Sequence, residues 1–70
     1  VVGDLRREED IARLFAEVRS RFDRIDVLVN NAALYPRHLF LEGPADELAS
    51  VLEVNVLGMA RCCRAALPGM

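Results

Sequence analysis

The sequence predicts an α/β fold in which part of a doubly wound parallel sheet is followed by a long helix. Three observations support this class: apolar residues recur at helical spacing within 8–22, an apolar run follows at 25–30, and a second helical pattern fills 45–67. The apolar pair Val1-Val2 precedes the first helix, so strand, helix and strand occur in the order of a βαβ unit. A right-handed crossover would place both strands parallel in one sheet, with their carboxyl ends at one rim.

The chain is short for an independent domain. With 70 residues, a fold buries only about 60% of its unfolded surface, and a single small core rarely supplies more than about 3 to 5 kcal/mol. Cys62 and Cys63 are adjacent, a spacing that suits neither an ordinary disulfide nor a CxxC pair of metal ligands. Reduced thiols indicate a cytoplasmic setting. We therefore expect residues 1–70 to be an internal fragment of one larger domain, without a metal site.

Composition and charge narrow the classes of partner. Hydrophobic residues make up 53% and charged residues 29% of the chain, as in folded globular proteins. The net charge is −2 and acids and bases are interspersed, so no basic stripe is available to neutralise the phosphates of a nucleic acid. The apolar runs are much shorter than the roughly 20 residues of a membrane span. We expect neither nucleic acid nor a membrane as partner.

The first helix is predicted over residues 8–22. Its apolar positions are spaced by three or four residues: Ile11, Leu14, Phe15, Val18 and Phe22. Glu9 with Arg13, and Glu17 with Arg21, are acid-before-base pairs four residues apart, each worth a few tenths of a kcal/mol. This charged face therefore indicates solvated surface and not a site.

The apolar run Ile25 to Val29, interrupted only by Asp26, predicts a strand covered on both faces. The turn Asn30-Asn31-Ala32-Ala33 follows it directly. In open α/β sheets ligands bind beyond the carboxyl ends of the strands, and two alanines leave the backbone open to a planar ligand. The spacing alone nevertheless favours a simpler interpretation, in which the Asn pair only shapes the turn.

A loop is predicted from Leu34 to Gly43, and a long helix over 45–67, with Pro44 at its first turn and Pro68-Gly69 at its end. One face of this helix is apolar except for a single Asn. At 100° per residue this face comprises Leu48, Val51, Leu52, Asn55, Met59, Cys62 and Ala66. An unpaired amide on an apolar face costs about 1 to 3 kcal/mol, so Asn55 must find hydrogen-bond partners.

Three short motifs lie at Asp4-Leu5, at Asn30-Asn31-Ala32-Ala33 and from Val54 to Gly58. In their order and spacing they resemble motifs of the short-chain dehydrogenases/reductases, and the resemblance covers essentially the whole chain. The turn Asn30-Asn31-Ala32-Ala33 resembles the family's Asn-Asn-Ala-Gly signature, with Ala33 in place of Gly. Asp4-Leu5 is similar to the Asp-Val/Leu pair that contacts adenine, and the segment from Val54 to Gly58 resembles the family's Val-Asn-hydrophobic-x-Gly motif. The resemblance implies a partial Rossmann-type NAD(P)-binding domain of the classical type.

The resemblance also implies roles for individual residues. Asp4 and Leu5 would border the adenine ring, and the turn Asn30-Asn31-Ala32-Ala33 would line the adenosine side of NAD or NADP. Asn55 would belong to the catalytic tetrad: at an irregularity of the long helix, its backbone carbonyl would hold a water in a proton relay. Without the family, the residues favour a hydrogen-bonded Asn that only shapes the helix.

The implied activity is hydride transfer between nicotinamide and a carbonyl or alcohol substrate by the full-length parent. Residues 1–70 contain neither the family's Gly-rich pyrophosphate turn nor its Tyr-x-x-x-Lys pair, since Tyr35 is followed four residues later by Leu39. We therefore expect the isolated chain to be inactive. Two alternatives stay open, a non-catalytic NAD(P)-binding protein and a helix-mediated interaction protein.

Two further features of the sequence bear on function. His38 is a lone histidine in the predicted loop, and such a residue is more often solvent-exposed and inert than catalytic. The small residues at Val54, Gly58 and Ala65 would allow another helix to pack closely. The family's corresponding helix commonly packs against its symmetry mate, which implies a homodimer or homotetramer of the full-length protein through the 45–67 helix. Packing within the chain or simple exposure of these residues is an equal alternative.

Overall fold

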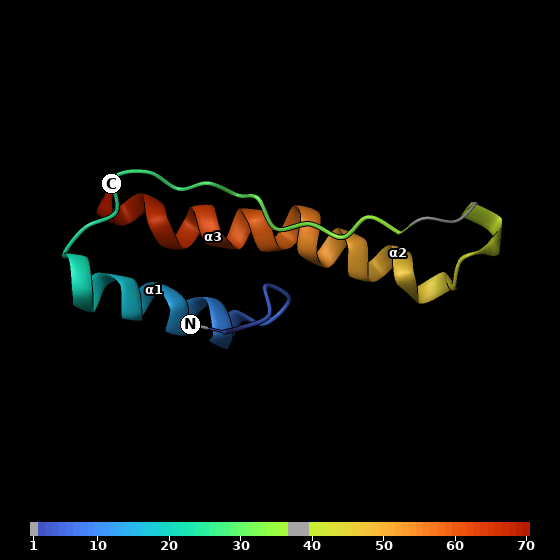
Figure 1. Ribbon diagram of the computed structural model, residues 1–70, viewed down its shortest axis with the longest axis horizontal. Coiled ribbons are helices and arrows are strands. Elements are labelled where there is room, and N and C mark those ends of the chain that lie inside the picture. Colours follow the sequence, from blue (N-terminus) through green and yellow to red (C-terminus); the bar gives the residue numbers. More distant parts are fainter. Residues whose placement is uncertain (1, 37–39) are drawn as a thin grey trace.

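The computed structural model describes residues 2–36 and 40–70 and consists of two helical rods with an extended segment returning along them (Figure 1). The first rod is α1, Glu8–Phe22. The second is continuous: α2 (Ala45–Leu52) passes into a π-helical segment, η2 (Glu53–Gly58), and then into α3 (Met59–Ala66). Short 3-10 turns, η1 (Phe40–Glu42) and η3 (Leu67–Gly69), lie before and after this rod.

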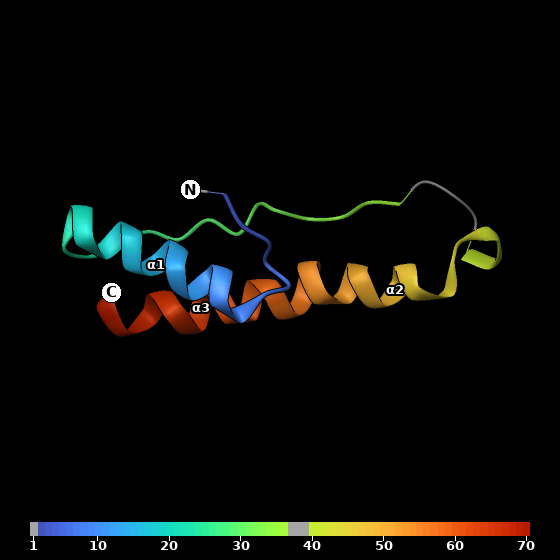
Figure 2. The ribbon, with the colours of Figure 1, turned by 90° about the horizontal axis from the view of Figure 1, so that it is seen from below.

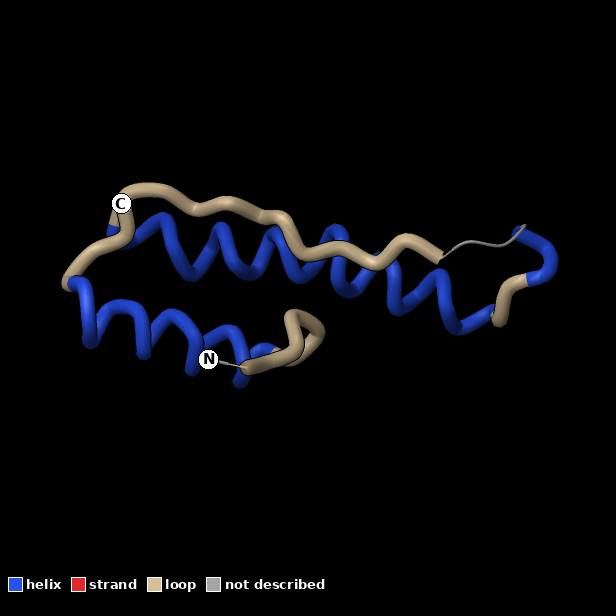
Figure 3. Tube along the Cα trace, in the orientation of Figure 1, coloured by secondary structure: helices blue, strands red, loops and turns tan. Residues whose placement is uncertain are grey.

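Helix α1 has the bounds predicted from the sequence. No side chain caps its start, but Glu8, Glu9 and Asp10 occupy the first turn, where negative charge interacts favourably with the helix dipole. The helix ends where Asp23 adopts a φ of 63° and its backbone N–H donates to the Arg19 carbonyl oxygen at 3.2 Å. The chain then reverses and runs back along the second rod (Figure 3).

The predicted sheet is not formed within the described residues, because none of positions 2–36 and 40–70 belongs to a β-strand. Residues 24–36 are extended, but a strand ladder requires a neighbouring strand to accept and donate backbone hydrogen bonds. The strand-like alternation is still visible: Leu28 packs against the core, whereas Val27 and Val29 are each 76% exposed. The segment 2–5 and this extended segment lie on the same side of the helices (Figure 2).

The core lies where α1 packs beside α3. Its buried members are Ile11, Phe15, Ile25, Cys62 and Ala66. Burying an aliphatic or aromatic side chain of this size stabilises the fold by about 1.5 to 3 kcal/mol. The apolar face predicted for the second helix is buried only in part, because Leu48, Leu52 and Met59 remain about half exposed. Among the described elements α1 contacts α3 and not α2, so α1 does not cover the α2 part of that face.

The described residues include neither a membrane-spanning helix nor a cluster of metal ligands. No helix there is long and apolar enough to cross a membrane. Within residues 2–36 and 40–70, no group of three or more His, Cys, Asp or Glu side chains could hold a metal ion. Both cysteines are free thiols. His38 lies outside the described residues.

Candidate functional site

Asn55 lies inside the π-helical segment Glu53–Gly58. In a π turn the backbone N–H bonds to the carbonyl five residues earlier instead of four, so one carbonyl is skipped where the α pattern resumes. Such segments are rare and occur frequently at functional sites. The helix irregularity that the family resemblance implies at Asn55 is therefore present.

The Asn55 amide pairs with both backbone groups of Leu34. The Leu34 N–H donates to Asn55 Oδ1 at 2.8 Å, and Asn55 Nδ2 donates to the Leu34 carbonyl at 3.0 Å. The side chain thus acts as a peptide group would in a strand pair, and the expectation that Asn55 must find partners is confirmed. Because Leu34 directly follows the turn Asn30-Asn31-Ala32-Ala33, these two bonds attach the end of that turn to the helix.

The turn itself presents mostly open surface. Asn30, Asn31 and Ala32 are exposed and Ala33 is half-buried. Asn30 Nδ2 lies 3.5 Å from the Cys63 sulfur, a weak hydrogen bond that adds a second attachment to α3. Among the described non-glycine residues only Asp23 has a positive φ, so Ala33 carries no strain in the place of the signature's Gly.

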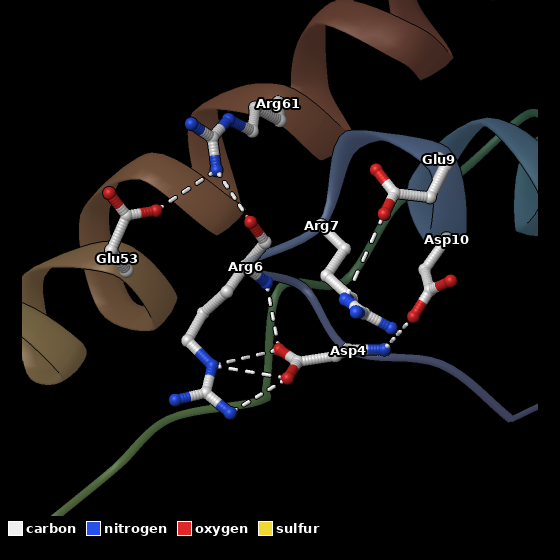
Figure 4. Close-up of polar contacts among 7 residues, drawn as sticks. All are labelled: Asp4, Arg6, Arg7, Glu9, Asp10, Glu53 and Arg61. Atoms are coloured by element: carbon white, nitrogen blue, oxygen red, sulfur yellow. Dashed lines mark hydrogen bonds and ion pairs between the residues drawn. The ribbon is translucent and has the colours of Figure 1, made fainter.

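Asp4 organises the turn that precedes α1 (Figure 4). Its carboxylate accepts hydrogen bonds from the Arg6 backbone N–H at 2.9 Å and from Arg6 Nη2 at 2.7 Å, and its own N–H donates to Asp10 Oδ2 at 2.8 Å. The Arg7 N–H donates to the Asp4 carbonyl at 3.0 Å, which closes the turn. The hydrogen bonds from Arg6 lower the pKa of Asp4 to about 2, so the side chain is ionised at neutral pH.

Leu5 lies directly against Gly58 of the π-helical segment. A Cβ atom added at Gly58 would stand 3.0 Å from Leu5 Cβ, 3.2 Å from the Leu5 carbonyl oxygen and 3.2 Å from the Glu53 carbonyl oxygen. Only glycine leaves room for this approach, and Gly58 is buried as a result. Of the alternatives that the sequence left open for Gly58, the structure shows packing within the chain, because the Leu5 turn covers it.

The other two residues of the predicted small-residue surface, Val54 and Ala65, are also partly covered by the chain itself. Ala65 packs on the core, and its carbonyl oxygen accepts a hydrogen bond from Arg19 Nη2. Val54 is half-buried. Packing within the chain, which the sequence left open, therefore accounts for much of this surface.

The π-helical segment is the place where the three sequence motifs meet. Asn55 is hydrogen-bonded to Leu34, which follows the Asn30-Asn31-Ala32-Ala33 turn, and Leu5 packs directly on Gly58. Motifs separated by more than twenty residues are thereby attached within one turn of a single helix. The sequence identified each motif, but it did not predict that the Val54 to Gly58 segment contacts both of the others.

A groove of about 480 Å³ lies beside this region at the start of α2. Its lining residues are Pro36, Leu41, Gly43, Pro44, Ala45, Glu47, Leu48 and Val51. Pro36 and Leu41 belong to the loop that the sequence predicted from Leu34 to Gly43. The α2 residues of the groove were not predicted, because on a helical wheel Leu48 and Val51 are indistinguishable from core positions.

Comparisons with known proteins are consistent with this arrangement. The family model described as "Enoyl-(Acyl carrier protein) reductase" matches residues 1–70. The chain is 37% identical over 67 residues to Dehydrogenase/reductase SDR family member 11 of Bos taurus, a match that covers 96% of this chain and 26% of that protein. It is 39% identical over 69 residues to L-fucose dehydrogenase of Mus musculus, covering 97% of this chain and 25% of that protein.

A solved structure has the same arrangement of elements. The crystal structure of a short-chain dehydrogenase from Streptomyces avermitilis superimposes with a TM-score of 0.86 at 40% identity, over 97% of this chain and 25% of that chain. The chain spans about a quarter of the length of the relatives that it matches.

Proposed function

Because the chain belongs to the short-chain dehydrogenase/reductase family, we propose that residues 1–70 are an internal part of one NAD(P)-binding Rossmann domain. The complete protein transfers a hydride between nicotinamide and a carbonyl or alcohol substrate. One observation carries the proposal: Asn55, in its π-helical turn, is hydrogen-bonded to the backbone that follows the Asn30-Asn31-Ala32-Ala33 turn.

The extended segment supports a sheet in the complete protein. Its backbone runs straight along the helices, and Val27 and Val29 present apolar side chains to solvent on the face away from them. Exposed apolar side chains next to unpaired backbone groups are stable only when further strands and a second helical layer cover them. We propose that residues 25–30 and the segment at Val2 are strands of that sheet.

The residues present fit a dinucleotide along this rim. The exposed turn with its two small alanines leaves the backbone approachable for the adenosine side, and Asp4 and Leu5 would border the adenine ring. NAD(P), when bound, supplies or accepts the hydride. The proposed cofactor is NAD or NADP, both of which the family uses.

Asn55 would act through its backbone carbonyl. Its amide oxygen and nitrogen are both engaged with Leu34, so the side chain serves to hold the turn. The π turn frees a backbone carbonyl in this segment for a water, which is the position that the family's proton relay requires. Asn55 would thus position the relay while Asp4, Leu5 and the Asn30-Asn31-Ala32-Ala33 turn border the cofactor.

The test uses the complete protein that contains residues 1–70. NADH-dependent and NADPH-dependent reduction of a panel of carbonyl compounds should give turnover. Asn55→Ala keeps the backbone carbonyl but removes the two hydrogen bonds to Leu34, so the carbonyl and its water are no longer held in position. It should lower kcat by about tenfold or more at saturating cofactor, since a well-placed proton transfer contributes about 10² to 10⁴-fold. Binding of NAD(P)H without turnover of any carbonyl or alcohol would instead support the non-catalytic alternative. Failure to bind either nucleotide would contradict the proposal.

The isolated chain should neither bind NAD(P) nor act on a substrate. Its extended segment lacks strand neighbours, and the apolar residues that it exposes favour association over a single ordered state. Titration of the purified 70-residue chain with NADH, followed by nucleotide fluorescence, should show no saturation. A cooperative melt of the chain alone would favour the helix-mediated interaction protein.

Oligomerisation through the second rod is part of the same proposal. Leu48, Leu52 and Leu57 are each between 42% and 51% exposed along α2 and η2. A homodimer or homotetramer that packs these residues together would remove them from water. Light scattering of the complete protein should give a multiple of the subunit mass, and Leu52→Glu should reduce it.

A further inference from the structure

The Arg61 side chain connects three separate parts of the structure. Its Nη1 donates to Glu53 Oε2 at 3.1 Å and to the Arg6 carbonyl oxygen at 3.4 Å (Figure 4). Its Nε lies 3.2 Å from Glu8 Oε1. Only 27% of the Arg61 side chain is exposed, so solvent screens these contacts less than it screens a surface ion pair.

The three partners are the elements that the candidate site depends on. Glu53 begins the π-helical segment that contains Asn55, Arg6 belongs to the turn organised by Asp4, and Glu8 begins α1. A guanidinium is planar and carries five N–H donors in a fixed geometry, so one side chain can bridge a carboxylate and a backbone carbonyl at defined angles. Arg61 therefore fixes this turn relative to the π-helical segment.

The internal bonds of the turn do not need Arg61. Asp4 holds its shape through Arg6 and Asp10. Gly58 sets how closely the turn approaches the helix, because Leu5 rests on it. The bond from Arg61 to the Arg6 carbonyl is a polar attachment of the turn to α3, so its loss changes where the turn lies and leaves its shape intact.

We propose that Arg61 is a positioning residue that holds the turn from Asp4 to Arg7 against the π-helical segment and thereby sets the affinity of the enzyme for the adenine half of NAD(P). This inference rests on the proposed function, in which Asp4 and Leu5 border the adenine ring. The effect should fall on cofactor binding, because none of the hydrogen bonds and ion pairs of Arg61 within the described residues is with Asn55 or with its partner Leu34.

The experiment compares Arg61→Met with the matched control Arg64→Met in the complete protein. Arg64 lies on the same helix and is exposed, and its side chain makes no hydrogen bond or ion pair within the described residues. Arg61→Met should raise the Kd for NADH or NADPH by about fivefold, the size of one partly buried ion-pair contact. It should leave kcat at saturating cofactor within about twofold. Binding of reduced nicotinamide mononucleotide, which lacks adenine, should not change.

Amide hydrogen exchange supplies a readout that is independent of cofactor. Peptides spanning residues 2–8 should exchange faster in Arg61→Met than in the wild type or in Arg64→Met, because the turn is less firmly held. An unchanged Kd with unchanged exchange would overturn the inference, and so would an equal loss of affinity for the mononucleotide. If the wild type binds neither NADH nor NADPH, the proposed function fails. Faster exchange in Arg61→Met would then still show that Arg61 attaches the turn to the helix, but not that it sets the affinity for a cofactor.

Discussion

Gly58→Ala tests the close approach of the Leu5 turn to the π-helical segment. The added Cβ would meet Leu5 Cβ at 3.0 Å and the carbonyl oxygens of Leu5 and Glu53 at 3.2 Å each. All three are main-chain or Cβ atoms, so the backbone of the turn and of the π-helical segment must shift, and overpacking of this kind costs about 1 to 3 kcal/mol, here toward the upper end. Alanine recovers about 1 kcal/mol of helix propensity over glycine. The net destabilisation should be about 1 to 2 kcal/mol.

The assay is thermal and urea unfolding of the complete protein, in which each kcal/mol lowers Tm by about 2 to 4 °C for a chain of 150 to 250 residues. Gly69→Ala is the matched control, because its Cβ would lie 3.6 Å from the Arg19 Nε and Nη2 atoms, an ordinary contact. That substitution should change stability by less than about 0.5 kcal/mol. If Gly58→Ala is as stable as the wild type while Gly69→Ala is neutral, the turn does not rest on Gly58 as described.

Three further outcomes can be checked. Asn55→Ala removes two hydrogen bonds to the loop backbone and should destabilise the complete protein by about 1 to 2 kcal/mol in urea unfolding; a neutral result would contradict the pairing. Arg6→Ala should raise the pKa of Asp4 from about 2 toward its usual 3.8, which carboxyl NMR would measure. Because the pKa of Asp4 is lower in the folded state than in the unfolded state, the stability that Asp4 contributes is present above about pH 4. It is lost as the pH falls toward 2. Iodoacetamide should label Cys63 before Cys62, because Cys62 is 5% exposed and burial raises its thiol pKa; equal rates in single-cysteine variants would argue against this packing.

Local sequence signals predicted the helices well. The spacing from Ile11 to Phe22 gave the bounds of α1, since one amphipathic stripe with an acidic first turn determines a helix largely by itself. The extent of the second rod followed from Pro44 and the Pro68-Gly69 pair. In both helices the residues that predict where the helix begins and ends lie within a few positions of that boundary.

The sheet and the partners of the site depended on contacts distant in sequence. Residues 25–30 have a strand's composition, but a strand needs hydrogen bonds from a neighbour, and the described chain supplies none to this segment. The requirement that Asn55 be hydrogen-bonded was predicted, whereas Leu34 as its partner was not, because that pairing arises only once the extended segment lies along the helix. Arg61 gave no signal, since a lone arginine on a charged helix face does not differ from a solvated one.

The π-helical turn also changes the rotational phase of the rod that contains it. An inserted residue shifts everything beyond it by about 100° relative to a regular helix of 3.6 residues per turn. A helical wheel drawn through α2 and α3 therefore overlays two surfaces that point in different directions. Cys62 and Ala66 of α3 can face α1, while Leu48 of α2 faces the groove near Pro36. One continuous helix thus presents two independently oriented faces, and a single-residue deletion within 53–58 would force them back into one.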